Sequence, residues 1–383
     1  MRMRRWKIVV VGAVVVWSGS VHAQFAQEGP ALNRKVRNLG MGNVGVALIG
    51  THDSSPFYNP AGLNDLEKGR FQFMSPTLDT SRGALDLLIS DVGDFVNAVS
   101  DAQTDAERTR AFDQFLSEHQ GDFEQARLTL DIFNYSRKNF AAGLVLDERL
   151  HLSFRDPTFP RFEMQNLADV ALYVAMSHDF REKLIQVGVM IKPTVRFSLD
   201  EADQEFTYSD VVTENSNGDP ILKDQVKNIK DRRFGLGVDL GLKSNVSFLK
   251  GLPGYDYLKP EVGFAWQDIG SPSFSGAPGN EQSLSTGFAV HPNFWKLKNS
   301  VAVDFRELNQ DRPFFSKFHF GLEAKFPWIF ALRGGVSQGY LTGGLTLDGN
   351  WVKLDAAIYS EEIGVKSTEA GSLRYAATLS FNI

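Results

Sequence analysis

Apolar and polar residues alternate with a period of two over long stretches of this chain. Between Phe140 and Phe154 the even positions are mostly apolar, whereas the odd positions include Asp147, Arg149 and His151. Successive side chains of a β-strand point to opposite faces, so this pattern predicts strands with one apolar face and one polar face. The alternation recurs around residues 126–132, 168–177, 185–198, 233–243, 258–267 and 318–325. The sequence therefore predicts an all-β protein.

The length of these strands separates two kinds of all-β protein. Strands of soluble sandwiches are typically five or six residues long, but many alternating runs here extend to about ten or more. A tilted strand needs that length to cross a bilayer, and closing the barrel leaves no unpaired edge in the lipid. We therefore favour a transmembrane antiparallel β-barrel of about 14 strands over a sandwich that buries its apolar faces between two sheets.

The connections between the predicted strands also alternate in length. Short ones fall near 137–138, 180–183, 292–295, 327 and 348–350, and longer ones near 79–123, 156–163, 200–229, 270–280, 308–314 and 360–370. Bacterial outer-membrane barrels have short periplasmic turns and longer outer loops. The last alternating run, Leu373 to Ile383, contains the aromatic residue Phe381 near its end. We expect the barrel assembly machinery to engage this C-terminal strand as the chain enters outer-membrane lipid.

Residues 83–120 interrupt the alternation. Apolar residues recur there at helical spacing, and Thr104 with Glu107 forms the sequence of a capping box at the start of a second helix. We therefore expect residues 67–383 to form the barrel, with 83–120 as a helical insertion on an outer loop. Candidate residues for capture of a hydrophobic ligand are Leu88, Val92, Phe95, Phe112 and Phe115. The alternative for these residues is packing of the two helices against each other over the barrel mouth.

The N-terminus has the features of a secretory signal peptide. Basic residues precede an apolar run from Ile8 to Trp17, and Val21-His22-Ala23 has the small-x-small pattern of a cleavage site. We expect residues 1–23 to be removed and the chain to reach the bacterial outer membrane. The formal net charge then changes from −6 to −10, because 40 basic residues against 46 acidic ones become 36 against 46. This acidic balance argues against a nucleic-acid partner.

Two glycine-rich matches to enzyme motifs lie in the wrong context. Gly335–Gly339 spells G-x-S-x-G, which requires a strand-to-helix turn, but it lies between alternating strands and is interpreted as a hairpin loop. Gly40–Gly45 spells G-x-G-x-x-G without a preceding apolar strand or a βαβ unit. The histidines are dispersed, and the loop 214–219 lacks EF-hand spacing. We therefore predict no catalytic residue, no metal and no cofactor.

Charged residues of both signs fall on the polar face of the predicted strands. Opposite charges on neighbouring strands can pair, whereas a selectivity filter would show one dominant sign at a constriction. We interpret these residues as ion pairs that fill a narrow lumen. They are Arg127, Asp131, Asp147, Arg149, Asp169, Lys192, Arg196, Arg233, Asp239, Lys259, Glu261, Asp304, Arg306, Glu323, Lys325, Lys353 and Asp355.

The segment 24–66 carries the most specific motif. In order it contains Leu39-Gly40-Met41-Gly42, Val46-Ala47, Asp53-Ser54-Ser55 and Asn59-Pro60-Ala61-Gly62-Leu63. This series resembles the start of the FadL-type family of outer-membrane transporters for hydrophobic compounds, in which the N-terminal segment folds into the barrel as a hatch. The resemblance implies a fourteen-stranded barrel and a plug over residues 24–66, with Asn59, Pro60 and Ala61 at the hatch and Gly40 and Gly42 in the same plug motif. The series is also similar to PorV-like secretion factors and TraF-like conjugal-transfer barrels, which do not import lipids.

Two functions follow from these expectations. The first is passive uptake of a hydrophobic small molecule, a long-chain fatty acid or an aromatic hydrocarbon, by a monomeric barrel whose plug shifts to let the molecule pass. The alternative is a non-transporting barrel that acts as a structural or docking component of a secretion or conjugation system. An enzyme is less favoured, because no nucleophile, base and orienting group converge in the sequence.

Overall fold

The structure is a computed structural model that describes most of the chain. The described residues are 32, 34–87, 91–102, 104–155, 161–181, 183–198, 205–207, 232–294, 297–327, 329–349, 351–364 and 366–382. The predicted signal peptide 1–23, the first part of the predicted plug and the loop 214–219 lie outside these residues.

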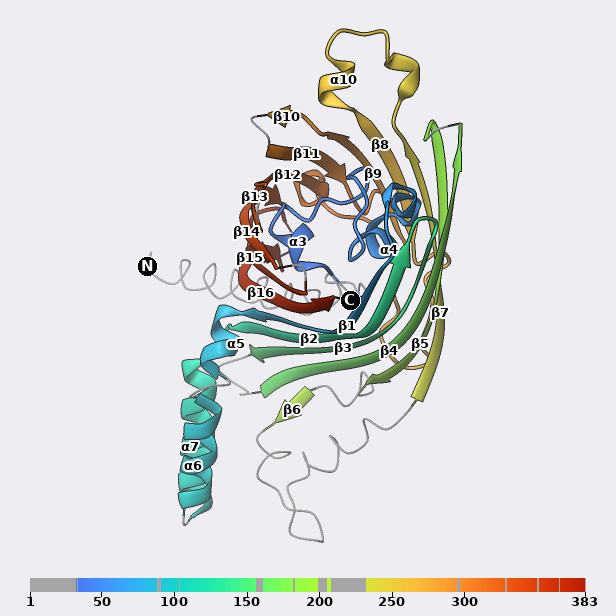
Figure 1. The fold of residues 1–383 in the computed structure, drawn as a ribbon. Coiled ribbons are helices and arrows are strands. Elements are labelled where there is room, and N and C mark those ends of the chain that lie inside the picture. The colour runs from blue at the N-terminus through green and yellow to red at the C-terminus, as the bar shows by residue number, and fades with distance from the viewer. Residues whose placement is uncertain are drawn as a thin grey trace, which may run out of the picture.

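Fourteen of the described strands form one closed antiparallel barrel (Figure 1). They are β1 (Arg70–Ser81), β2 (Phe123–Arg137), β3 (Phe140–Arg155), β4 (Arg161–Phe180), β5 (Ile185–Ser198), β7 (Arg232–Ser244), β8 (Glu261–Gln267), β9 (Ser283–Val290), β11 (Leu297–Phe305), β12 (Phe318–Lys325), β13 (Phe330–Ser337), β14 (Tyr340–Asp348), β15 (Val352–Glu362) and β16 (Gly371–Asn382). Neighbours in this order pair with each other, and β1 pairs with β16 to close the ring. The short strands β6 (Glu205–Thr207) and β10 (Asn293–Phe294) pair antiparallel with β4 and β11 respectively. The predicted fold class is confirmed.

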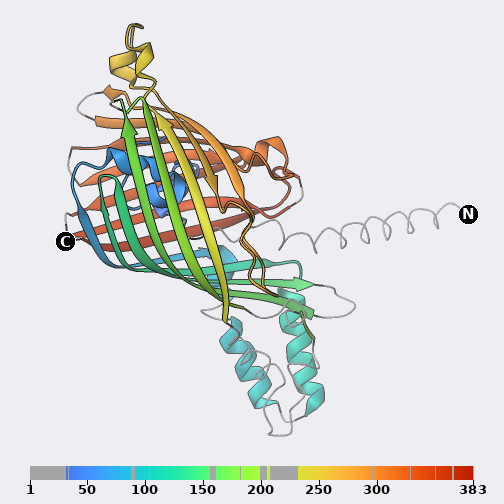
Figure 2. The ribbon, with the colours of Figure 1, turned by 90° about the vertical axis from the view of Figure 1, so that its right-hand side faces the viewer.

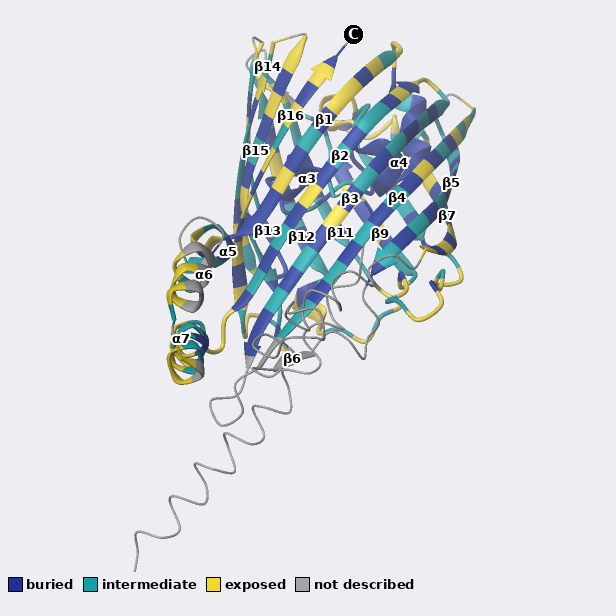
Figure 3. Cartoon of the chain, turned by 90° about the horizontal axis from the view of Figure 1, so that it is seen from below, coloured by how far each residue is buried: buried dark blue, intermediate teal, exposed yellow. Residues whose placement is uncertain are grey.

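The alternation in the sequence becomes an inside and an outside of the barrel. Figure 3 shows buried and exposed residues following one another along the strands. Apolar residues such as Phe234, which is 65% exposed, cover the outer surface, while Asp147 and Arg149 of β3 are buried in the lumen. An apolar exterior around a polar interior is the pattern of a membrane-spanning barrel. None of the described helices is both long enough and apolar enough to cross a membrane.

Lys259 is exposed instead of facing the lumen, because residues 255–258 form the helical turn α10 (Tyr255–Leu258) and β8 begins only at Glu261. The prediction for Lys259 is therefore wrong.

The hairpin interpretation of Gly335–Gly339 is confirmed, because β13 and β14 are joined by Gln338 and Gly339, both with positive φ. Two such residues in succession are typical of a tight hairpin turn.

The insertion between β1 and β2 is helical, as predicted. It contains α5 (Arg82–Asp86), α6 (Val92–Asp101) and α7 (Asp105–Glu118). The predicted capping box is present: the Thr104 hydroxyl accepts from the Glu107 backbone N–H at 3.3 Å, and the Thr104 N–H donates to the Glu107 carboxylate at 3.1 Å. Figures 1 and 2 show α6 and α7 side by side, projecting away from the strands.

The described part of the N-terminal segment, residues 34–66, lies inside the barrel (Figure 1). It contains the short helices α3 (Val36–Leu39) and α4 (Ser55–Tyr58) and the 3-10 helix η1 (Pro60–Asp65). We call residues 34–66 the plug. Its apolar residues form three buried clusters with small and aromatic residues of the wall, for example Leu63 with Tyr173, Met41 with Ala302, and Leu39 with Tyr359.

Candidate functional site

Asn59 joins the plug to the barrel wall at the centre of the predicted hatch motif. Its side-chain carbonyl accepts from the Ala61 backbone N–H at 3.1 Å and thereby caps η1. Its amide nitrogen lies 2.7 Å from the carbonyl oxygen of Val46 in the plug and 3.0 Å from that of Leu242 on β7. Pro60 occupies the first position of η1, where its missing N–H costs nothing. One buried side chain thus satisfies backbone groups of the plug and of the wall.

Glycines on the lumen side of the wall let this motif approach closely. A Cβ atom at Gly188 of β5 would lie 2.3 Å from the Ala61 backbone nitrogen, and one at Gly241 of β7 would lie 2.1 Å from the side-chain oxygen of Asn59. Sequence reasoning did not identify these two glycines as part of the site. Their positions could have indicated this role, because a glycine at an inward-facing position of an otherwise regular strand often marks the close approach of another backbone.

Gly40 and Gly42 make an equally close contact with the opposite part of the wall. A Cβ atom at Gly40 would lie 2.8 Å from Cα of Gly344 on β14, and one at Gly42 would lie 2.0 Å from the carbonyl oxygen of Phe320 on β12. Gly42 has a φ of +65°, and its N–H donates to Thr342 Oγ1 at 2.9 Å. At both predicted plug-motif positions a side chain would therefore clash with the wall, and at Gly42 the backbone conformation also favours glycine.

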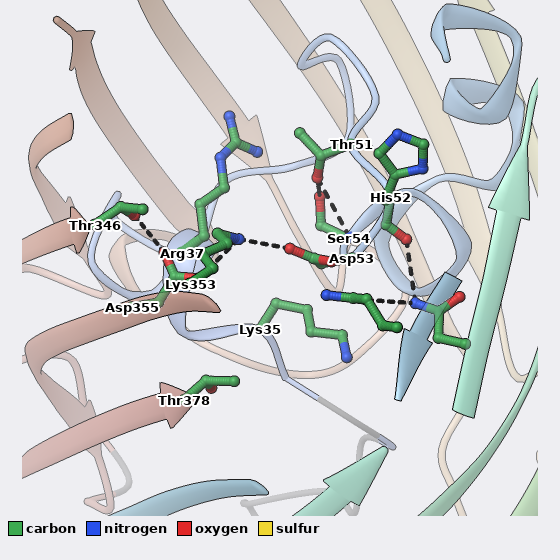
Figure 4. Close-up of polar contacts among 12 residues, drawn as sticks. Lys35, Arg37, Thr51, His52, Asp53, Ser54, Thr346, Lys353, Asp355 and Thr378 are labelled. Atoms are coloured by element: carbon green, nitrogen blue, oxygen red, sulfur yellow. Dashed lines mark hydrogen bonds and ion pairs between the residues drawn. The ribbon is translucent and has the colours of Figure 1, made fainter. Parts of the chain in front are cut away.

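Ion pairs surround the plug on several sides. Lys35 lies 2.7 Å from Asp131 on β2, Arg37 lies 2.8 Å from Glu323 on β12, and Lys353 on β15 lies 2.6 Å from Asp53. Figure 4 shows the Lys353 ammonium directed at Asp53 and the Arg37 guanidinium turned away from that pair. At the end of η1, Asp65 pairs with Lys183 and Lys243. The plug also donates two backbone hydrogen bonds to Asp304, from Gly45 and from Val46.

The two plug carboxylates Asp53 and Asp65 are held in their charged forms. Burial, the largest single effect, would raise the pKa of each carboxyl group, but Lys353 together with Lys35 and Arg70 outweighs it at Asp53, and Lys243 together with Lys183 and the Gly50 N–H outweighs it at Asp65. Both pKa values therefore lie well below the ordinary value for aspartate. The plug is consequently fixed by charge pairs at neutral pH as well as by its apolar clusters.

The inward charges of neighbouring strands pair with one another, as the sequence predicted. Arg127 lies 2.7 Å from Asp147, and Arg149 and Arg196 lie 2.5 and 2.7 Å from Asp169. This ladder crosses strands β2 to β5. The charges of both signs are largely committed to one another, which fits a filled lumen better than an ion-selective pore.

The structure brings together the described members of the predicted capture site. The Phe95 and Phe115 rings stack with centroids 4.6 Å apart, and Phe112 is only 2% exposed within a cluster that includes Leu87 and Phe154. These rings therefore hold α6, α7 and the end of β3 together. Leu88 lies outside the described residues, and for Val92 only the backbone position in α6 is given.

Two cavities lie on opposite sides of the plug. The larger, of about 750 Å³, opens at the end of the barrel that carries the short turns and is lined by Arg37, Asp53 and Lys353 among others. The smaller, of about 60 Å³, lies near Arg34 and Arg306. Among the described residues, no three His, Asp or Glu side chains lie close enough together to hold a metal ion.

Comparison with known proteins places the fold. No family model matches the sequence, and no curated protein matches it. Among solved structures, a TodX monoaromatic hydrocarbon channel mutant is 12% identical, with a TM-score of 0.50, and the match covers 91% of this chain and 98% of that one. The CymD monoaromatic hydrocarbon channel is 11% identical over 92% and 96% of the two chains, with a TM-score of 0.47. The toluene transporter TbuX of Ralstonia pickettii is 13% identical over 92% and 97%, with a TM-score of 0.45. The chain has a barrel fold similar to that of TodX.

Proposed function

We propose that this protein is an outer-membrane barrel for passive uptake of hydrophobic small molecules. The observation that carries this proposal is the closed fourteen-stranded barrel filled by its own N-terminal segment, in a fold similar to that of the hydrocarbon channel TodX. Long-chain fatty acids and aromatic hydrocarbons are the two substrate classes to compare. Outer-membrane localisation and a monomeric state are part of the same proposal.

In this proposal the ligand is captured at the helical insertion and passes when the plug moves. The rings of Phe95 and Phe115 are partly buried, so a small separation of α6 from α7 would offer an apolar surface to a ligand. Within the barrel, the plug is fixed by discrete polar contacts such as Lys353–Asp53 and Asp304–Gly45. Such contacts can be exchanged for alternative polar partners, so the plug can shift while the wall remains intact.

Uptake of radiolabelled fatty acid and of radiolabelled toluene by a deletion strain tests the proposal. Wild-type protein expressed from a plasmid should restore uptake of at least one of them. The chain contains no cysteine, so the double variant Asp53→Cys/Lys353→Cys can be joined by a reversible bifunctional thiol reagent. Joining the plug to the wall should stop uptake, and a reductant should restore it. Unchanged uptake of every ligand in a strain that assembles the barrel normally would contradict the proposal.

A docking role is the second candidate, because the helical hairpin projects from the barrel with polar residues exposed. The exposed residues include Asp94 and Asn97 of α6 and Asp113, Gln114 and Glu118 of α7. Purification in mild detergent, with and without residues 83–120, tests this role. A stoichiometric partner that is retained only when the insertion is present, together with unchanged ligand uptake after its deletion, would favour docking over transport.

A further inference from the structure

The larger cavity at the short-turn end combines plug residues with the ends of wall strands. The plug contributes Arg37, residues 50–53 and residues 65–66. The wall contributes the start of β1, the end of β16 and the turns that join β12 to β13 and β14 to β15. We call this cavity the vestibule. It is open to the solvent and lies apart from the helical insertion, where ligand capture is proposed.

The deep part of the vestibule has more cations than carboxylates. Glu323 receives hydrogen bonds from Arg37 at 2.8 Å and Arg333 at 2.6 Å, and it lies 3.7 Å from Lys325. Lys353 lies between Asp53 and Asp355, at 2.6 and 2.8 Å. This part therefore contains four cations but only three carboxylates. The single carboxylate of Glu323 is shared by three of the cations.

The rim of the vestibule adds further cations. Lys68, Arg70 and Lys298 line it, and none of the three forms an ion pair with another residue in the described part of the chain. Over the whole cavity, seven lining residues are Lys or Arg and four are Asp or Glu; counting Glu323 and Asp355 as well, which pair with four of these cations, seven cations face six carboxylates and the wall keeps a net positive charge. The pKa of the plug residue His52 is lowered first by burial and then by Arg70, which agrees with a positive potential at this wall.

Buried hydrogen-bonding groups in the same wall lack partners among the described residues. The unpaired atoms are two donors, Nη1 of Arg37 and the amide nitrogen of Asn382, and two acceptors, Oδ1 of Asn382 and Oδ1 of Asp53; Arg37 and Asn382 are themselves more than nine-tenths buried. A buried donor without an acceptor is costly and is rare in folded proteins. The two unpaired donors, together with the cations, favour a ligand rich in acceptor oxygens, and the two unpaired oxygens can accept from a hydroxyl group of the same ligand.

We propose that the vestibule binds a phosphate group. A phosphate offers several acceptor oxygens to donors that arrive from different directions, and guanidinium groups match its geometry. Ile329 and Trp351, at the β12–β13 and β14–β15 turns, line the same cavity and are 57% and 71% exposed. They form an apolar edge that suits the organic part of a phosphoester. The phosphate can belong to a phospholipid headgroup of the adjacent leaflet or to a soluble phosphoester.

Binding to the purified full-length barrel tests this proposal and distinguishes the two sources. Glycerol 3-phosphate is titrated by calorimetry in detergent, and phosphatidylglycerol is tested by native mass spectrometry after reconstitution in mixed phosphatidylglycerol–phosphatidylcholine nanodiscs. The variant Lys298→Gln/Lys325→Gln should weaken binding about tenfold or more, because it removes two charged donors. Binding of the wild type should also weaken as the salt concentration rises.

The control variant is Lys250→Gln, which removes an exposed lysine from the β7–β8 turn at the same end of the barrel, outside the vestibule. It should bind like the wild type. Selective retention of phosphatidylglycerol would identify a lipid as the source, and binding of glycerol 3-phosphate in detergent would identify a soluble phosphoester. Absence of binding for both probes, or equal weakening by Lys250→Gln and by the double variant, would overturn the proposal. Uptake is not measured in this experiment, so its result is independent of the transport proposal.

Discussion

Lys353 of strand β15 lies 2.6 Å from the carboxylate of Asp53 in the plug, although the two residues are 300 positions apart in the chain. Strand β15 thus holds the plug in place through a contact between distant parts of the chain. Asp53 is buried and gains this cation only when the barrel has closed around the plug, whereas Lys353 also pairs with Asp355 of its own strand at 2.8 Å. The plug and the wall therefore stabilise each other.

The first prediction concerns this ion pair. Lys353→Met should destabilise the folded protein by about 3–5 kcal/mol, because it leaves the carboxylates of Asp53 and Asp355 buried without their shared cation. Denaturant titration in detergent measures this change, and the exposed Lys250→Met provides the control. A cysteine placed at Ser54 should also react faster with a thiol reagent in the Lys353→Met background. Equal stability of the two lysine variants would contradict the prediction.

The plug should loosen in acid. The pKa values of Asp53 and Asp65 are lowered in the folded protein, so each contributes stability that is fully present above the unfolded value of about 4. That contribution is lost progressively as the pH falls below about 4 and the unfolded state takes up protons first. Thermal unfolding measured from pH 7 to pH 2.5 should therefore show a steep fall below pH 4. The double variant Asp53→Asn/Asp65→Asn should start from a lower stability and show a shallower fall. Parallel curves for the two proteins would exclude these carboxylates as the cause.

The Asn59-Pro60-Ala61 motif of the plug lies very close to the wall, which gives a third prediction. Gly241→Ala should displace Asn59, because the added Cβ would lie 2.1 Å from its side-chain oxygen and the inner wall has no room for it. We expect a loss of stability of about 1–3 kcal/mol, the range for overpacking a buried site. Gly251→Ala is the matched control, since nothing lies within 4 Å of a Cβ atom at that position. Similar unfolding midpoints for the two variants would mean that the hatch can move away without cost.

The architecture was predictable because the alternation along each strand is a local property. Runs such as 140–154 contain their own evidence for an inner and an outer face, and the number of such runs gave the fourteen-stranded barrel. The prediction was wrong at Lys259, where residues 255–258 turn into a short helix although their pattern continues that of the next strand. Alternation does not distinguish a strand from a turn over four residues.

The partners within the lumen were not predictable in the same way. That Arg127 and Asp147 would pair follows from adjacent strands, but the pairing of Lys353 with Asp53 depends on where the plug lies inside the closed barrel. Gly188 and Gly241 likewise allow a close contact only because the Asn59-Pro60-Ala61 motif of the plug lies against them. The vestibule arises from residues of the plug and several wall strands, so no single segment contains its signal.

The last prediction separates packing from capture at the helical insertion. Phe112 is 2% exposed and contacts the cluster of Leu87, Leu116 and Phe154, so Phe112→Ala should cost the insertion about 3–5 kcal/mol. The insertion should then become sensitive to limited proteolysis, while the barrel keeps its resistance and its heat-modifiable migration in gels. Phe95 is only partly buried, so Phe95→Ala should leave the insertion folded. If α6 and α7 capture the ligand, Phe95→Ala should lower uptake although the insertion stays folded. If the phenylalanine rings only pack the helices against each other, uptake should fall only in variants that unfold the insertion. Normal uptake with Phe112→Ala, despite cleavage of the insertion, would exclude the helices from transport and leave docking as their function.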